Sequence, residues 1–203
     1  MAMRLQELHP ATVHFPIALL PLSLGADVLG LLTRNRGLME VRRLTMPIAA
    51  AASAVAGLLG LIAQEVVRTD EEAGDMLITH RTLNLGLIAM AGTMAVKRFG
   101  EKKPDVGYLA VGAVGLGAMF YSAYLGGQMV YDRGVGVAIA GGLRQEIAPP
   151  LSRPRDATTM SAKHIVRGAQ RTVQELAAGQ VAPNLVPRWM SHRADDGDVH
   201  PPR

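Results

Sequence analysis

Four long runs of apolar residues, almost free of charge, constrain this chain more than any other feature. The runs cover residues 15–32, 46–63, 83–96 and 106–127 of 203. An α-helix needs about 20 apolar residues to cross roughly 30 Å of hydrocarbon, and the run at 83–96 approaches that length only if it starts near Ile78. Because runs of this purity leave no polar stripe for water to wet, we predict four transmembrane helices rather than a soluble all-α bundle.

Composition divides the chain into two parts. Hydrophobic residues make up 49% of it and aromatic residues only 4%, and the apolar residues are concentrated before residue 131. We therefore expect an all-α, integral membrane four-helix bundle over residues 1–140, followed by an extramembrane tail over residues 141–203. The N-terminal segment lacks the basic stretch and cleavage site of a secretory signal peptide, so we expect the first helix to insert uncleaved.

The charges between the runs predict an orientation. The connections at 34–43 and 97–105 each carry four basic residues, against one and two acidic residues. The connection near 70–75 is acidic instead. Cytoplasmic loops are enriched in Lys and Arg, so we expect the two basic connections inside and both termini outside, in the periplasm, with the chain in the bacterial inner membrane and in contact with the lipid bilayer.

The basic balance does not indicate nucleic-acid binding. The isoelectric point of about 9.8 arises from the anchoring loops and the tail, and no basic face interleaved with aromatic residues occurs. Catalysis is not favoured either, because no Ser–His–Asp order, H-E-x-x-H motif or paired-acid arrangement is found.

Polar residues next to the predicted spans gather at the outer end under this topology. His9 and His14 precede the first span, His80 and Arg81 begin the third, and Arg133 follows the fourth. These residues come from distant parts of the sequence, and only the alternating topology places them at one surface. This convergence is the strongest functional signal in the chain.

Proline constrains the start of the first helix. In "HPATVHFP" (9–16) the residue before each proline is disfavoured in the α region, so we expect the helix to begin at Phe15 or Pro16, with His14 beside its N-cap. We expect His80 in the first turn of the third helix, where the positive end of the helix dipole favours a neutral imidazole, with Asn84 one turn further on the same face.

Small residues predict where helices approach closely. Ala52, Ala56 and Gly60 repeat every four residues in the second span, and the fourth span repeats the pattern with Ala118, Ser122 and Gly126. Asp27 is the one acid deep in a span. We expect it to form an ion pair or snorkel toward Arg34 rather than act as a proton relay.

Three stretches resemble one family: "LHPATVHFPIALLPLSLGADVLGLL" near the N-terminus, "THR" at 79–81, and "YLGGQMVYDRGVGV" at 124–137. Together they resemble the bacterial membrane family catalogued as domain of unknown function 2231, over residues 8–140. The resemblance implies a four-helix inner-membrane bundle whose His-Pro, His-Phe-Pro, third-helix His and Gly-Gly-x-x-Val-Tyr elements meet at one face. Some members carry an appended Rieske or cytochrome domain, which hints at electron transfer. This chain has no such domain and no cysteine.

The lack of cysteine limits the cofactors to noncovalent ones. It excludes thiolate metal sites, cysteine-ligated iron–sulfur clusters and covalently attached c-type haem. Two readings remain: b-type haem with His14 and His80 as axial ligands and Arg81 and Arg133 on its propionates, or a metal site of His9, His14 and His80. A quinone is a further variant. The plain alternative is that these histidines only cap helices and orient the incoming chain.

The tail contains a predicted amphipathic helix at about 158–180. Its apolar face consists of Ile165, Val166, Ala169, Val173, Leu176 and Ala177. We expect this face to lie on the outer leaflet or on a partner subunit. Two functions stay open: an electron carrier or sensor served by a periplasmic redox partner, or an accessory or structural subunit of a larger membrane complex.

Overall fold

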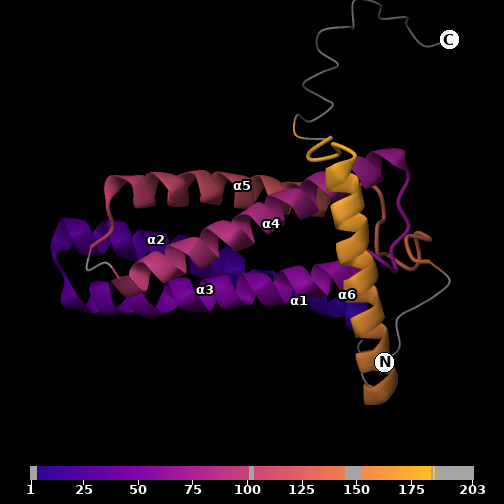
Figure 1. Cartoon of the computed structure of the whole chain (residues 1–203), viewed down its shortest axis with the longest axis horizontal. Coiled ribbons are helices and arrows are strands. Elements are labelled where there is room, and N and C mark those ends of the chain that lie inside the picture. Colours follow the sequence, from indigo (N-terminus) through magenta and orange to yellow (C-terminus); the bar gives the residue numbers. More distant parts are fainter. Residues whose placement is uncertain (1–3, 101–102, 145–151, 184, 186–203) are drawn as a thin grey trace, which may run out of the picture.

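The protein is a bundle of long helices with one helix laid across its end. The computed structural model describes residues 4–100, 103–144, 152–183 and 185. Its helices are α1 (Leu5–Thr12), α2 (His14–Thr33), α3 (Arg36–Ala63), α4 (Glu71–Gly100), α5 (Val106–Tyr131) and α6 (Pro154–Ala177). Helices α2 to α5 run along the long axis, α1 continues α2, and α6 crosses near the end where α1 lies (Figure 1). The predicted all-α class is confirmed.

Three stretches within the described residues are long and apolar enough to cross a membrane. They are Gln6–Thr33, which joins α1 and α2, Arg43–Ala63 of α3, and Val106–Tyr131, which is α5. Helix α4 contacts α3 and α5 in the same bundle. It does not qualify by composition, because polar residues in its first half lower its mean hydropathy. The structure therefore supports three candidate spans, and a fourth span by α4 stays a prediction.

The expected start of the first helix is wrong. The chain is helical from Leu5, with only a turn at Val13, whose N–H donates to the His9 carbonyl oxygen at 3.1 Å. Pro16 is the third residue of α2, where a missing N–H breaks no hydrogen bond within the helix. Because of this early start, His9 lies within a helix, α1, and not in the non-helical segment that the proline pattern predicted.

The third predicted span also begins earlier than expected. Helix α4 starts at Glu71, and the Asp70 carboxylate accepts a hydrogen bond from the N–H of Ala73 at 2.7 Å. His80 and Arg81 therefore lie in the third turn, not the first. The helix dipole, whose effect falls off within the first turn, therefore does not act on His80 as the sequence predicted.

The main core of the bundle consists largely of aliphatic side chains and methionines. Its buried members include Leu20, Leu24, Met46, Leu87, Met94 and Met119, drawn from all four long helices. Small residues permit the close approach that these contacts need: a Cβ built on Gly112 of α5 would lie 2.4 Å from the Leu24 side chain. The helices thus pack through the small residues expected of membrane bundles.

Helix α6 packs on the bundle of its own chain through an unexpected face. Its buried residues are Ala157, His164, Gly168 and Thr172, whereas Val166 and Val173 of the predicted apolar face stay exposed. The reason is that α6 crosses α3 at Gly168, which sets the face of α6 that is buried. A Cβ on Gly168 would lie 2.6 Å from the Gln64 Nε2 atom and 3.0 Å from the Leu61 carbonyl oxygen, so the crossing requires glycine.

We predict that Gly168→Val detaches α6. Overpacking a close contact costs about 1–3 kcal/mol, which corresponds to a roughly 5- to 150-fold increase in opening. Hydrogen exchange of the α6 amides in the full-length protein should rise accordingly. Gly86→Val is the matched control, because a Cβ at Gly86 of α4 meets no atom within 4 Å. Unchanged exchange in the Gly168 variant would contradict this account of the crossing.

Candidate functional site

His80 of α4 is fixed against the backbone of α5. Its Nδ1 atom lies 2.8 Å from the carbonyl oxygen of Ser122 and 3.0 Å from the Ser122 hydroxyl oxygen. Asn84, one turn along α4, donates to the same hydroxyl at 2.7 Å and to the His80 carbonyl at 2.7 Å. A Cβ on Gly126 would lie 3.4 Å from the ring, so the imidazole rests on helix backbone.

His9 of α1 makes the equivalent contact with α3. Its Nδ1 atom lies 2.9 Å from the carbonyl oxygen of Ala56. A Cβ on Gly60 would lie 3.1 Å from the His9 ring, closer than ordinary side-chain contact. Both histidines therefore lie on the small-residue stripes that the sequence indicated. At these points the stripes are covered by the two histidine rings of the same chain.

The two imidazoles lie next to each other, and the Nε2 atom of each takes no part in these hydrogen bonds. Their ring centroids are 6.4 Å apart, and the rings are nearly perpendicular at 88°. A carbonyl oxygen can only accept a hydrogen bond, so Nδ1 carries the proton in each neutral ring and Nε2 carries the lone pair. The pair of His9 and His80 thus presents the atoms that a metal ion or a hydrogen-bond donor would bind.

His14 does not join this pair. It is exposed at the start of α2, and it follows His9 by five residues, which turns it to another side of the helix. Among the described residues, no three His, Cys, Asp or Glu side chains are placed to hold one metal ion. The structure therefore brings together two of the three predicted metal ligands.

The two predicted propionate-binding arginines are engaged by carboxylates of this chain. Arg81 is 8% exposed, donates to the Gln64 Oε1 atom at 3.1 Å and pairs with Glu175 of α6. Arg133 pairs with Glu72 and lies 3.5 Å from Asp70. Arg81 is thus closed off from an external carboxylate, whereas Arg133 is ion-paired but its side chain stays 33% exposed.

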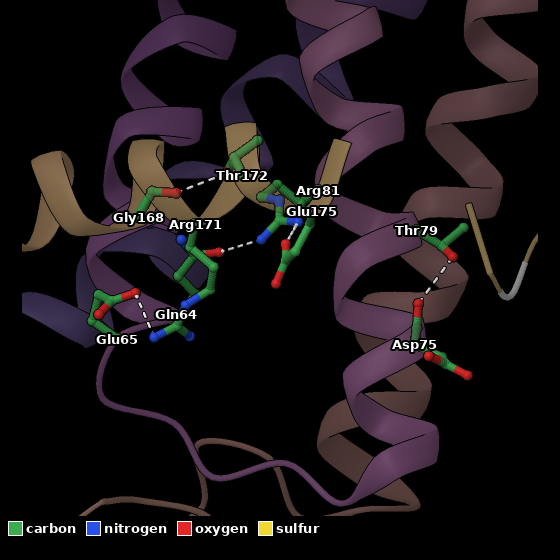
Figure 2. A network of polar contacts seen from close by, with 9 residues as sticks. All are labelled: Gln64, Glu65, Asp75, Thr79, Arg81, Gly168, Arg171, Thr172 and Glu175. Carbon is green, nitrogen blue, oxygen red and sulfur yellow. Dashed lines mark hydrogen bonds and ion pairs between the residues drawn. The ribbon is translucent and has the colours of Figure 1, made fainter. Parts of the chain in front are cut away.

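A polar layer joins α6 to the end of the bundle where α1 lies (Figure 2). Besides the Arg81–Glu175 pair, Arg171 of α6 lies 3.4 Å from the Glu65 carboxylate. Both the Gln64 Nε2 atom and the Arg81 Nε atom are buried in this layer without a hydrogen-bond partner. Ion pairs thus hold the layer together, but two buried N–H groups in it have no hydrogen-bond acceptor.

Sequence reasoning missed several residues of this end. Ala56 and Ser122 appeared only as packing residues, although their carbonyl oxygens orient the histidines, and no side-chain signal marks a backbone acceptor. Glu175 was also missed, because it lies 94 residues from Arg81. A buried arginine needs a counter-ion, and the polar face of the tail helix was the signal that could have indicated one.

Comparison with known proteins identifies the bundle. The family described as a predicted membrane protein (DUF2231) matches residues 6–139. The chain belongs to the DUF2231 family. No curated protein and no solved structure matches it. The matched range includes both histidines and ends before α6, so the helix that supplies Glu175 lies outside the DUF2231 region.

A second buried polar cluster lies at the other end of the DUF2231 bundle. Asp27 of α2 pairs with Arg98 in the last turn of α4, and both side chains are at most 3% exposed. Arg98 also donates to the Tyr108 hydroxyl of α5 at 2.6 Å. The expectation that Asp27 pairs with Arg34 is therefore wrong: Arg34 ends α2 in a left-handed conformation and is exposed. An ion pair that links three helices is a structural role for this acid.

We predict that Arg98→Met strongly destabilises the protein. Removing one partner of a buried ion pair costs about 3–5 kcal/mol, since it leaves an uncompensated charge. Thermal unfolding in detergent should therefore occur at a clearly lower temperature. The double variant Asp27→Leu with Arg98→Met should recover most of the loss, because an apolar pair of similar volume is often neutral or stabilising.

The neighbouring residue offers a matched control. Lys97 donates to the Asp105 carboxylate at 2.9 Å, and this hydrogen bond lowers the pKa of the Asp105 carboxyl. Both side chains are exposed, so solvent screens the pair and Lys97→Met should change unfolding little. Equal losses from the two methionine variants would argue against a special role of the buried pair.

Proposed function

We propose that this DUF2231 protein binds one transition-metal ion between His9 and His80 at the outer end of its bundle. The observation that carries the proposal is that both Nδ1 atoms are committed to backbone carbonyls, at 2.9 and 2.8 Å, with the rings 6.4 Å apart. Metal-bound histidines use such a second hydrogen bond to fix the ring and its tautomer. Simple helix capping does not require two such rings to lie this close together.

The ring separation suits a single shared ion. An imidazole nitrogen binds a metal such as zinc at about 2.0–2.1 Å, which puts two rings on opposite sides of one ion with centres roughly 6 Å apart. His9 and His80 have a centroid separation of 6.4 Å. The distance between the rings therefore supports shared coordination.

The donor set favours copper(I). Two nitrogens leave zinc short of its usual four ligands, whereas copper(I) accepts two nitrogens in line. Met76 and Met129 are buried one helical turn from His80 and Gly126, but they pack in a hydrophobic cluster with Val67 and Leu125, so the proposed ligands are the two histidines alone. A copper ion held there would supply one-electron chemistry toward a periplasmic partner.

Haem b stays a prediction that this geometry does not favour. Its proposed ligand His14 is exposed, and Arg81 and Arg133 already bind carboxylates of the chain. An accessory role in a larger membrane complex likewise stays a prediction. The copper-binding experiment described below also tests the haem prediction and the accessory-role prediction.

The proposed orientation has both described ends of the chain in the periplasm, with α4 as a fourth span across the inner membrane. In support, the connection between α2 and α3 and that between α4 and α5 lie together at one end of the bundle, opposite α1 and α6 (Figure 1). The segments 34–43 and 97–105, which include these connections and the adjoining helix ends, carry the excess of Lys and Arg that marks cytoplasmic loops.

Single cysteines test this orientation in a chain that has none of its own. A membrane-impermeant maleimide should label Thr69→Cys, between α3 and α4, in intact spheroplasts. It should label Lys103→Cys, between α4 and α5, only after lysis. Both native residues are exposed. The reverse pattern would overturn the orientation, and labelling of both in intact cells would show that α4 does not cross.

We predict that the purified protein binds one equivalent of copper(I) and loses it when either histidine is replaced. Copper(I) would be titrated anaerobically against a chromogenic chelator, with His9→Ala and His80→Ala compared with the wild type. His14→Ala is the matched control and should keep full binding. The physical reason is that a single remaining imidazole cannot hold the ion in a two-ligand site.

Three outcomes would overturn the copper proposal. Binding that survives replacement of both His9 and His80 would place the metal elsewhere. A Soret band lost in His14→Ala and His80→Ala would establish the haem prediction instead. Stable co-purification with another membrane protein, with no metal bound at any concentration, would favour the accessory role.

A further inference from the structure

Helix α6 lies outside the DUF2231 region and is placed as a helix at a membrane surface would be. It crosses the long helices near their outer end, and its axis is steeply inclined to theirs (Figure 1). If the bundle axis crosses the bilayer, α6 therefore runs along the outer surface. This step rests on the membrane assignment of the bundle and not on the metal site.

The sides of α6 differ in chemistry. The side of His164, Gly168 and Thr172 is buried against the bundle. Turned away from the bundle, Val166 and Val173 are 55% and 66% exposed. Counted at 3.6 residues per turn, Ala162, Ala169 and Leu176 extend these two valines into one apolar stripe.

A polar stripe runs beside the apolar one. Lys163, Arg167 and Gln174 share it and are all exposed. Arg171, on the edge of this stripe, lies 3.4 Å from Glu65, which follows the end of α3. On the other side of the buried face, beside the apolar stripe, Ile165 packs with the cluster that includes Leu59 of α3. The polar stripe therefore leans outward from the bundle and the apolar stripe leans toward the membrane.

We infer that the apolar stripe of α6 is embedded in the outer leaflet, with Lys163 and Arg167 at the level of anionic lipid headgroups. Three observations identify lipid as the occupant: the inclined helix, the inward lean of the apolar side, and continuity with lipid-facing side chains. Val55 and Leu58 of α3 are 51% and 48% exposed close to the crossing point. An amphipathic helix with basic residues on its polar side binds such an interface.

Nitroxide labels on single cysteines test this in the full-length protein. The protein would be reconstituted in vesicles of phosphatidylcholine and phosphatidylglycerol. Accessibility to oxygen, which concentrates in the acyl region, would be compared with accessibility to a water-soluble nickel complex. Val173→Cys and Gln174→Cys are a matched pair, because they are adjacent and both exposed. We expect the oxygen-to-nickel ratio to be several-fold higher at position 173.

Val55→Cys separates failure of this inference from failure of the membrane assignment. A high oxygen ratio at 55 with strong nickel access at both 173 and 174 would show that the bundle spans but α6 lies in water. Low access of both reagents at 173 would show that protein covers the stripe. A second copy would be indicated if that shielding disappeared at low protein-to-lipid ratio. Either result overturns the lipid proposal.

Discussion

The half of this bundle nearest to α1 depends on imidazole rings that lie directly on helix backbones. In a helix each carbonyl oxygen keeps a second lone pair, and those of Ala56 and Ser122 accept from His9 and His80. The contact is possible because no side chain projects at Gly60 or Gly126. Together the two contacts tie α1 to α3 and α4 to α5. Small-residue stripes thus serve to admit polar rings as well as to bring helices together.

The positions of the long helices could be predicted from the sequence because apolar length and purity set them directly. Their ends could not. Pro16 indicated a helix start, yet a proline in a first turn is equally compatible with a helix that begins before it, as the turn at Val13 allows. The acidic residues after Asp70 indicated a loop, but they form the first turn of α4, where negative charge is favourable.

The sequence predicted which residue types form the site and that they gather at one end of the bundle. It did not predict which of these residues pair with one another. His9 and His14 are both adjacent to the first span, and the choice between them depends on rotation about the α1–α2 axis. A break at Val13 makes that rotation unreadable from periodicity. Ion pairs were harder still: Asp27 and Arg98 lie 71 residues apart. Burial alone indicates that such charges need partners, without naming them.

Helix α6 lies outside the family region of the chain and pairs with a residue inside it. Arg81 lies one residue after His80 and is buried, so its charge requires the carboxylate that α6 supplies through Glu175. Without α6 this buried guanidinium would lose its carboxylate partner and keep only the hydrogen bond to Gln64, and a buried charge without a counter-ion is costly. Glu175 therefore does more than attach the tail: it neutralises a buried charge within the DUF2231 region.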